Sequence, residues 1–152
     1  MKIALDLDGV LGDTRPLWRD WLLDAARVLG VDPAALPEDR AAAADELDSS
    51  GAGNWRILLA RFAEDRAPVY LRPNADAAAA LRSLEAAGAR VAVFTDAPDE
   101  LARVALSQLG ADRRVESLYA GADAEARALR SLGAGARIAR SRADFLNGAA
   151  AG

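Results

Sequence analysis

Hydrophobic and polar residues follow two different periods along this chain, and the change between them divides it into segments. A hydrophobic run at residues 3–5 leads into Asp6 and predicts a buried first strand. Residues 15–67 then place apolar side chains at helical spacing without any strand pattern. After residue 67, helical patterns alternate with three short strand patterns, at residues 89–95, 115–119 and 136–140. The pattern therefore predicts an α/β unit interrupted by a helical insertion.

The insertion is predicted to hold three helices. Pro16 suits the first turn of the first helix, which Gly30 ends. The second, at residues 33–47, is polar and rich in alanine, so we expect it to be largely exposed. The third begins near Trp55. Three tryptophans recur at helical spacing and indicate packing core rather than a ligand site: Trp18, Trp21 and Trp55.

The second half of the chain repeats a helix-then-strand order. Asn74 can cap a helix that runs through Leu84, and Pro98 begins a helix that ends at Gly110. A further helix is predicted at residues 123–132. Because strands separated by helices pair in parallel through right-handed crossovers, the fold class is α/β with a parallel sheet.

Length and composition restrict the class of protein. A chain of 152 residues makes one ordinary domain that buries roughly 70% of its unfolded surface. The formal net charge of −4 argues against nucleic acid or an anionic membrane surface as a partner. No charged-then-apolar leader opens the chain, and no apolar stretch approaches the length of about 18 residues that spans a bilayer. We therefore expect a soluble cytoplasmic protein.

The residue types that are missing limit the chemistry. The sequence has neither cysteine nor histidine, which excludes disulfides, zinc–thiolate sites and imidazole or thiol catalysis. Lys2 is the only lysine, so nearly every cation is an arginine. Any reaction must depend on carboxylates, hydroxyls, arginines and metal.

Two acids directly follow the first strand. Asp6 and Asp8 are two residues apart and point to the same side of an extended backbone, where their charges repel each other. A bound divalent metal is the simplest remedy, and Gly9 and Gly12 permit a tight backbone there. Asp and Gly are also ordinary turn residues, so solvated turn acids are the alternative. The end of a parallel strand, where α/β sheets bind ligands, favours a site.

The chain resembles the haloacid-dehalogenase-like (HAD) superfamily of phosphotransferases and phosphatases, in particular its phosphoglycolate-phosphatase-like members. Asp6-Leu7-Asp8-Gly9-Val10-Leu11-Gly12-Asp13-Thr14 is similar to the first motif of that family along its whole length. Val93-Phe94-Thr95-Asp96 is similar to the second motif. The resemblance implies a Rossmann-like core at residues 1–14 and 68–152, with a small helical cap at residues 15–67 that closes over the active site.

The resemblance also implies roles for matching residues. Asp6 is expected to attack phosphorus and form an aspartyl-phosphate, while Asp8 protonates the leaving oxygen. Thr95, with the adjoining Asp96, is expected to bind the transferring phosphoryl group. Mg²⁺ is expected on the carboxylate of Asp6, on the backbone carbonyl of Asp8 and on an acid after the fourth strand, for which Asp144 is the candidate.

The second half departs from the third and fourth motifs of the family. The third motif is a lysine or arginine and falls near Tyr119, where the nearest cations are Arg113, Arg114 and Arg127. The fourth motif is an acid just past the fourth strand, where the sequence reads Arg140-Ser141-Arg142-Ala143-Asp144. Asp144 is either a displaced metal ligand or a helix cap, and Asp96 is an alternative third carboxylate.

The leading hypothesis is a magnesium-dependent phosphatase that hydrolyses a small phosphorylated metabolite. The alternative is a degenerate HAD-like domain that binds a phosphorylated ligand or a protein partner without hydrolysis. A phosphoacceptor receiver domain also uses an Asp cluster and a hydroxyl, but it lacks a long helical insertion after the first strand. The sequence leaves the substrate and the oligomeric state open.

Overall fold

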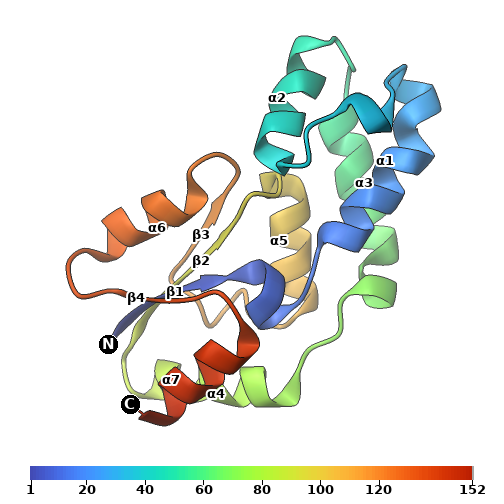
Figure 1. Cartoon of the computed structure of the whole chain (residues 1–152). Helices are drawn as coiled ribbons and strands as arrows, with labels where there is room; N and C mark the ends of the chain where they lie inside the picture. Colours follow the sequence, from blue (N-terminus) through green and yellow to red (C-terminus); the bar gives the residue numbers. More distant parts are fainter. Residues whose placement is uncertain (152) are drawn as a thin grey trace.

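The computed structural model describes the backbone of residues 1–151 and the side chains of residues 1–148. Within these residues the chain forms a four-stranded parallel sheet in the order β3-β2-β1-β4. Its strands are β1 (Lys2–Asp6), β2 (Arg90–Thr95), β3 (Ser117–Ala120) and β4 (Arg137–Ala139). Four helices surround the sheet: α4 (Ala75–Ala86), α5 (Asp99–Gln108), α6 (Ala124–Leu132) and α7 (Arg142–Ala151) (Figure 1). The α/β fold class predicted from the sequence is confirmed.

Both faces of the sheet are covered, which explains why the first strand is continuously hydrophobic rather than alternating. Ile3 and Leu5 of β1 pack with α4, α5 and α7 on one face. Ala4 packs on the other face against α6, together with Ala92 of β2. Alanine at these positions lets α6 approach the sheet closely, since its own contact residues include Ala124 and Ala128.

The residues between β1 and α4 form helices only, as predicted. They are α1 (Arg15–Leu29), a short 3-10 helix (Pro33–Ala35), α2 (Arg40–Ser49) and α3 (Trp55–Tyr70). Trp21 is buried between the other two tryptophans, with ring centroids 5.2 Å from Trp18 and 6.0 Å from Trp55. The three rings form a packing core, as predicted, although Trp18 also lines a cavity that is described below. Leu101 of α5 belongs to the same core and joins these helices to the sheet.

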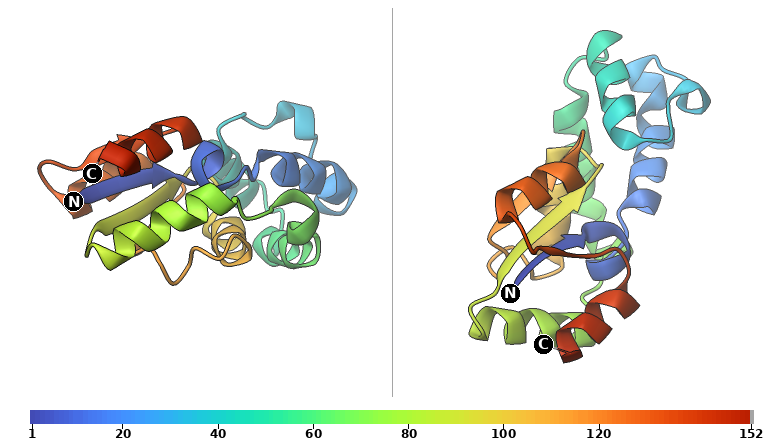
Figure 2. Two further views of the ribbon diagram at one scale, coloured as in Figure 1. Left: turned by 90° about the horizontal axis from the view of Figure 1, so that it is seen from below. Right: turned by 60° about the vertical axis from the view of Figure 1, so that its left-hand side comes forward.

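The inserted helices lie at one end of the sheet. Figure 2 shows from two further directions that they stand next to the carboxyl ends of the strands. This is the edge at which open α/β sheets bind ligands. Among residues 1–151, none of the helices combines the length and the hydrophobicity needed to cross a bilayer.

Two expectations about the insertion are wrong. Residues 33–47 do not form one helix, because Pro37 disfavours helical backbone at Leu36, which is extended (φ −79°, ψ 146°). The helix that does form there, α2, is not largely exposed. Four of its residues are buried: Arg40, Ala43, Ala44 and Leu47.

The boundary expected at residue 68 falls inside a helix. Pro68 lies in the last turn of α3, and the helix continues to Tyr70. A proline so near the carboxyl end removes one backbone donor without interrupting the preceding turns. α3 therefore runs from the inserted helices into the connection that leads to α4.

Candidate active site

A wide helical turn at Leu7–Leu11 connects β1 to α1; Asp6 is the last residue of β1, directly before the turn, and Asp8 lies within it. Within it Gly9 has φ +108°, a backbone conformation that favours glycine. A Cβ at this position would also lie 2.9 Å from the backbone oxygen of Arg140. The structure therefore requires glycine at position 9. Gly12 is different, because its extended backbone (φ −170°) needs no glycine and only its small size matters, against Leu109.

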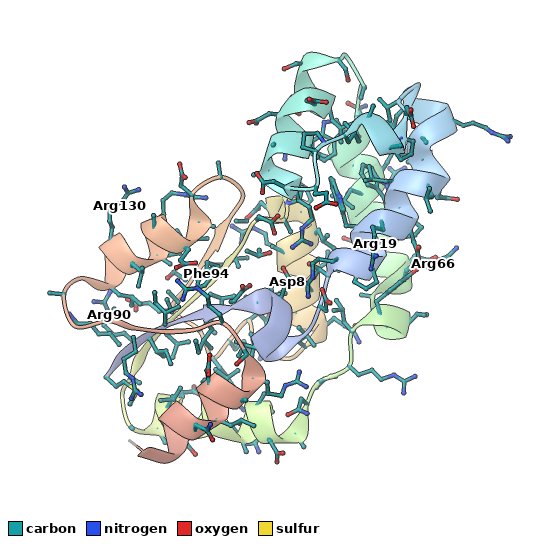
Figure 3. The ribbon with its side chains drawn as sticks, in the orientation of Figure 1. Asp8, Arg19, Arg66, Arg90, Phe94 and Arg130 are labelled. Atoms are coloured by element: carbon teal, nitrogen blue, oxygen red, sulfur yellow. The ribbon has the colours of Figure 1, made fainter. Side chains whose placement is uncertain are left out.

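A cavity of about 620 Å³ opens at the carboxyl ends of β1 and β2. It brings together four of the five residues predicted for the site: Asp6, Asp8, Thr95 and Asp96. Arg40 of α2 lines it from the inserted helices, and the amino end of α6 lines it from the opposite side. Figure 3 shows Asp8 beside the turn after β1, on the side of the inserted helices.

Of the three predicted acids that line the cavity, Asp6 accepts the fewest hydrogen bonds. Its carboxylate accepts a hydrogen bond from the backbone N–H of Asp8 at 3.1 Å. Burial, and then repulsion from the Asp8 carboxylate, raises the pKa of Asp6 to about 6. Asp6 thus lines the cavity, and its charged form is disfavoured there.

Asp8 is held very differently. One carboxylate oxygen, Oδ1, accepts hydrogen bonds from the backbone N–H and the hydroxyl of Thr14, both at 2.7 Å. The other, Oδ2, accepts from the Thr95 hydroxyl at 2.8 Å and from Arg40 Nη2 at 2.5 Å. Asp8 is buried, and both of its oxygens act as acceptors. In this conformation the Thr95 hydroxyl is directed to Asp8.

Arg40 was missed by the sequence analysis. Its side chain is 3% exposed and reaches from the first residue of α2 to the ends of both central strands. Besides Asp8, it donates from Nη1 to Thr14 Oγ1 at 2.6 Å and from Nη2 to Asp96 Oδ1 at 2.7 Å. Burial disfavours the charged form of Asp96, but hydrogen bonds and charge from Arg40 outweigh it and lower the pKa of Asp96.

Asp144 lies apart from the other predicted site residues. It is exposed on α7 and is not among the residues that line the cavity. Asp144 does not cap α7 either. Ser141 is the capping residue, because its Oγ accepts a hydrogen bond from the Asp144 backbone N–H at 3.1 Å. The arginines nearby have other partners: Arg140 pairs with Glu125, and Arg142 Nε donates to the backbone oxygen of Val10 at 3.1 Å.

The residues present do not fit the predicted magnesium site. Of the ligand set Asp6, Asp8 and Asp144, the structure places only the first two together. Among the described residues, no group of three acidic, histidine or cysteine side chains could hold a metal ion. Asp96, the alternative third carboxylate, is bound to Arg40. Arg40 thus pairs with both Asp8 and Asp96, so neither of these carboxylates is free to bind a metal ion.

The arginines nearest in sequence to the expected third motif also lie outside the cavity. Arg127 donates to the backbone oxygens of Ala120 and Ala122, and Arg114 pairs with Glu85. Neither of them, nor Arg113, is among the residues that line the cavity. The cations that do line it come from the inserted helices: Arg15 and Arg40.

A second cavity, of about 540 Å³, lies between α1 and residues 33–38. It shares Arg15, Arg40 and Asp96 with the first cavity, so the two meet at these side chains. Apolar walls come from Trp18 and Leu22, among others, and Arg19 contributes a charge. Figure 3 shows Arg19 on the same side of the molecule as Asp8, with Arg90 at the far end of the strands.

Comparison with solved structures identifies the fold, whereas comparison of the sequence alone does not. No family model and no curated protein matches the sequence. Among solved structures, CbbY from Rhodobacter sphaeroides in complex with phosphate superimposes with a TM-score of 0.66 at 18% identity, over 98% of this chain and 82% of that one. A putative β-phosphoglucomutase from Thermotoga maritima gives 0.56 at 16% identity, over 98% and 81%. The β-phosphoglucomutase from Clostridium difficile gives 0.54 at 14%, over 97% and 80%.

These structures are HAD-superfamily members, and the superposition covers nearly the whole chain. The chain therefore has the HAD-like fold, as the first motif indicated. At these identities the likeness concerns the fold.

Proposed function

We propose that this protein is a phosphotransfer enzyme that hydrolyses small phosphate monoesters through Asp6. The observation that carries the proposal is the position of the Asp6 carboxylate. It lies at the carboxyl end of β1, faces a cavity and accepts a single hydrogen bond, while its charge is disfavoured. A carboxylate of this kind is available as a nucleophile. The HAD-like fold and the first motif, Asp6 to Thr14, support the same reaction.

In the proposed reaction an oxygen of Asp6 bonds to phosphorus as the ester P–O bond breaks. The leaving oxygen takes a proton, and water then cleaves the aspartyl-phosphate to give inorganic phosphate and the free carboxylate. Asp8 is the nearest acid that can exchange this proton. To do so it must first take up a proton on Oδ2, which displaces the hydrogen bond from Thr95, and the water that cleaves the aspartyl-phosphate then returns a proton to it. The freed Thr95 hydroxyl can then donate to the phosphoryl group.

The substrate is proposed to be small, with room for its organic part in the second cavity. That cavity joins the first beside Arg40 and offers both apolar and charged walls. The magnesium requirement expected from the resemblance forms no step of this proposal, because its three predicted ligands do not come together.

Turnover of an aryl phosphate tests the proposal. We expect hydrolysis by the unmodified protein and a loss of at least about a thousandfold in Asp6→Asn, which keeps the shape of the side chain but not the nucleophile. Asp65→Asn, on the exposed face of α3, is the matched control and should keep full activity. Acid quenching should trap a phosphoryl group on Asp6. No turnover above Asp6→Asn, with or without added Mg²⁺, would contradict the proposal.

A second candidate is a module that binds a phosphorylated ligand without hydrolysis. It is favoured by the contacts of Asp8 and Thr95, because Asp8 accepts from Thr14 and Arg40 and the Thr95 hydroxyl already donates to Asp8. Calorimetry with a phosphate ester separates the two functions. Equal affinity in the unmodified protein and in Asp6→Asn, without turnover, supports the binding module.

A further inference from the structure

The Arg40 guanidinium lies between two acids of this site, Asp8 and Asp96. The guanidinium lies among side-chain oxygens of the residues that follow β1 and of the residues at and after the end of β2. Nη2 is 2.5 Å from Asp8 Oδ2 and 2.7 Å from Asp96 Oδ1, and Nη1 is 2.6 Å from Thr14 Oγ1. The guanidinium also lines the same cavity as Asp6. Positive charge therefore reaches the site from a helix of the insertion.

The two carboxylates bound to Arg40 differ in exposure. The side chain of Asp8 is 6% exposed, whereas that of Asp96 is 43% exposed. Asp96 Oδ1 accepts from both Nε, at 3.1 Å, and Nη2, so it occupies one two-donor edge of the guanidinium. Such an edge matches the oxygens of a phosphate group. Asp8 is thus a fixed partner, while Asp96 can exchange with an anion from solvent.

We propose that Arg40 binds the phosphoryl group of the ligand and takes the place of a divalent metal ion in this site. Phosphoryl oxygens replace Asp96 on the Nε–Nη2 edge, and Asp8 keeps the guanidinium in position from the other side. The inference rests on the proposed function, since it supplies the positive charge that transfer to Asp6 needs. It predicts that binding of inorganic phosphate and turnover of a phosphate ester both persist after metal ions are removed.

Isothermal titration with inorganic phosphate in the presence of EDTA tests this role. Arg40→Met should weaken binding by about tenfold or more, because it removes a charged donor. Asp96→Asn should tighten binding by several-fold to about tenfold, since it removes the competing anion and keeps an acceptor for the Arg40 backbone N–H. Asp123→Asn is the matched control. Asp123 lines the same cavity beside α6 and makes no hydrogen bond to Arg40, so its effect should be much smaller.

The result that overturns the inference is phosphate binding that appears only when MgCl₂ replaces EDTA. Equal affinity of Arg40→Met and the unmodified protein, or no phosphate binding in either buffer, overturns it as well. If Arg40→Met does not fold, the comparison of Asp96→Asn with Asp123→Asn decides the question, and equal affinities of these two variants refute the role of Arg40.

Failure of the inference can be distinguished from failure of the proposed function. Aryl phosphate turnover that EDTA abolishes leaves the function intact and removes the role of Arg40. Metal-independent phosphate binding that depends on Arg40, without turnover in either buffer, supports the inference and removes the hydrolase.

Discussion

The carboxyl ends of the central strands and the carboxyl end of β4 lie on the same edge of the sheet but are used differently. The acids and the hydroxyl after β1 and β2 face a cavity and contact one another. The side chains after β4 support the backbone instead. Arg142 donates to the carbonyl of Val10, and Ser141 caps α7. Arg140 pairs with Glu125.

The comparison shows that this site is built from the first two strands and the inserted helices rather than from the whole sheet edge. Arg40 extends from α2 and neutralises the carboxylates of Asp8 and Asp96, whereas no residue after β4 pairs with them in the part of the chain that the structure describes. Substitutions beside β1 and β2 should therefore change both charge and function, while those after β4 should change stability alone. The following experiments test this division, from the largest expected effect to the smallest.

Removal of Asp8 should have the largest effect. We expect Asp8→Ala to lower the free energy of unfolding by about 3 kcal/mol, because it leaves the buried Arg40 with Asp96 as its remaining carboxylate partner. Denaturant unfolding measures the change. The double variant Asp8→Leu with Arg40→Met should recover to within about 1 kcal/mol of the unmodified protein, since it removes both charges. A double variant no more stable than Asp8→Ala contradicts this account.

Gly9 connects the two regions, because it packs against the backbone after β4. Gly9→Ala should cost about 2 kcal/mol, from the positive φ and from a Cβ placed 2.9 Å from the Arg140 oxygen. Gly53→Ala is the matched control. Gly53 also has positive φ (+64°), but a Cβ there meets nothing within 4 Å, so its cost should be smaller. Equal losses in the two variants show that the Arg140 contact contributes nothing.

The sequence predicts the fold and the β1 side of the site more completely than the rest, for physical reasons. A buried strand and a turn that needs Gly9 leave a local signature, so Asp6 and Asp8 could be placed at a ligand-binding edge. Arg40 leaves no such signature. It is the one basic residue of a polar helix, and its burial depends on contacts with Asp8, Thr14 and Asp96, which lie 32, 26 and 56 residues away in the sequence.

The region after β4 was harder to interpret because its residue types permit several contacts. Asp144 has the composition of a cap or a ligand, yet Ser141 lies in the position that caps the helix. An arginine such as Arg142 can bind phosphate or backbone carbonyls equally well, and only the approach of the Leu7–Leu11 turn decides. The sequence does not encode that approach locally.

Asp6→Asn should stabilise the protein at neutral pH by about 1–2 kcal/mol. The pKa of Asp6 is about 6 in the folded state against 3.8 ordinarily, so the folded state binds the proton more tightly. The protein is therefore as stable as it would be with a neutral Asp6 below about pH 4, and it loses stability relative to that state as the pH rises to about 6. The full shift corresponds to about 3 kcal/mol, which partial exposure of the carboxyl reduces.

Thermal or denaturant unfolding of both proteins across this range checks the sign. The advantage of Asp6→Asn should be small near pH 4 and reach its maximum above about pH 6. An advantage that is constant with pH, or that is greatest in acid, contradicts the pKa shift. For the same reason, turnover by the unmodified protein should increase as the pH rises through about 6, because only the ionised carboxylate attacks phosphorus.

The smallest effects should come from substitutions after β4. Two residues there test whether this region only stabilises the backbone or also takes part in the reaction. Arg142→Ala removes the hydrogen bond from Nε to the Val10 oxygen and should cost about 1 kcal/mol of stability. Asp144→Ala removes an exposed carboxylate and keeps the backbone N–H that binds Ser141, so its cost should be below about 0.5 kcal/mol. Neither variant should change the affinity for inorganic phosphate in EDTA. A loss of phosphate affinity or of turnover in Asp144→Ala would place that carboxylate in the reaction after all, and the division between the two regions of the sheet edge would then be wrong.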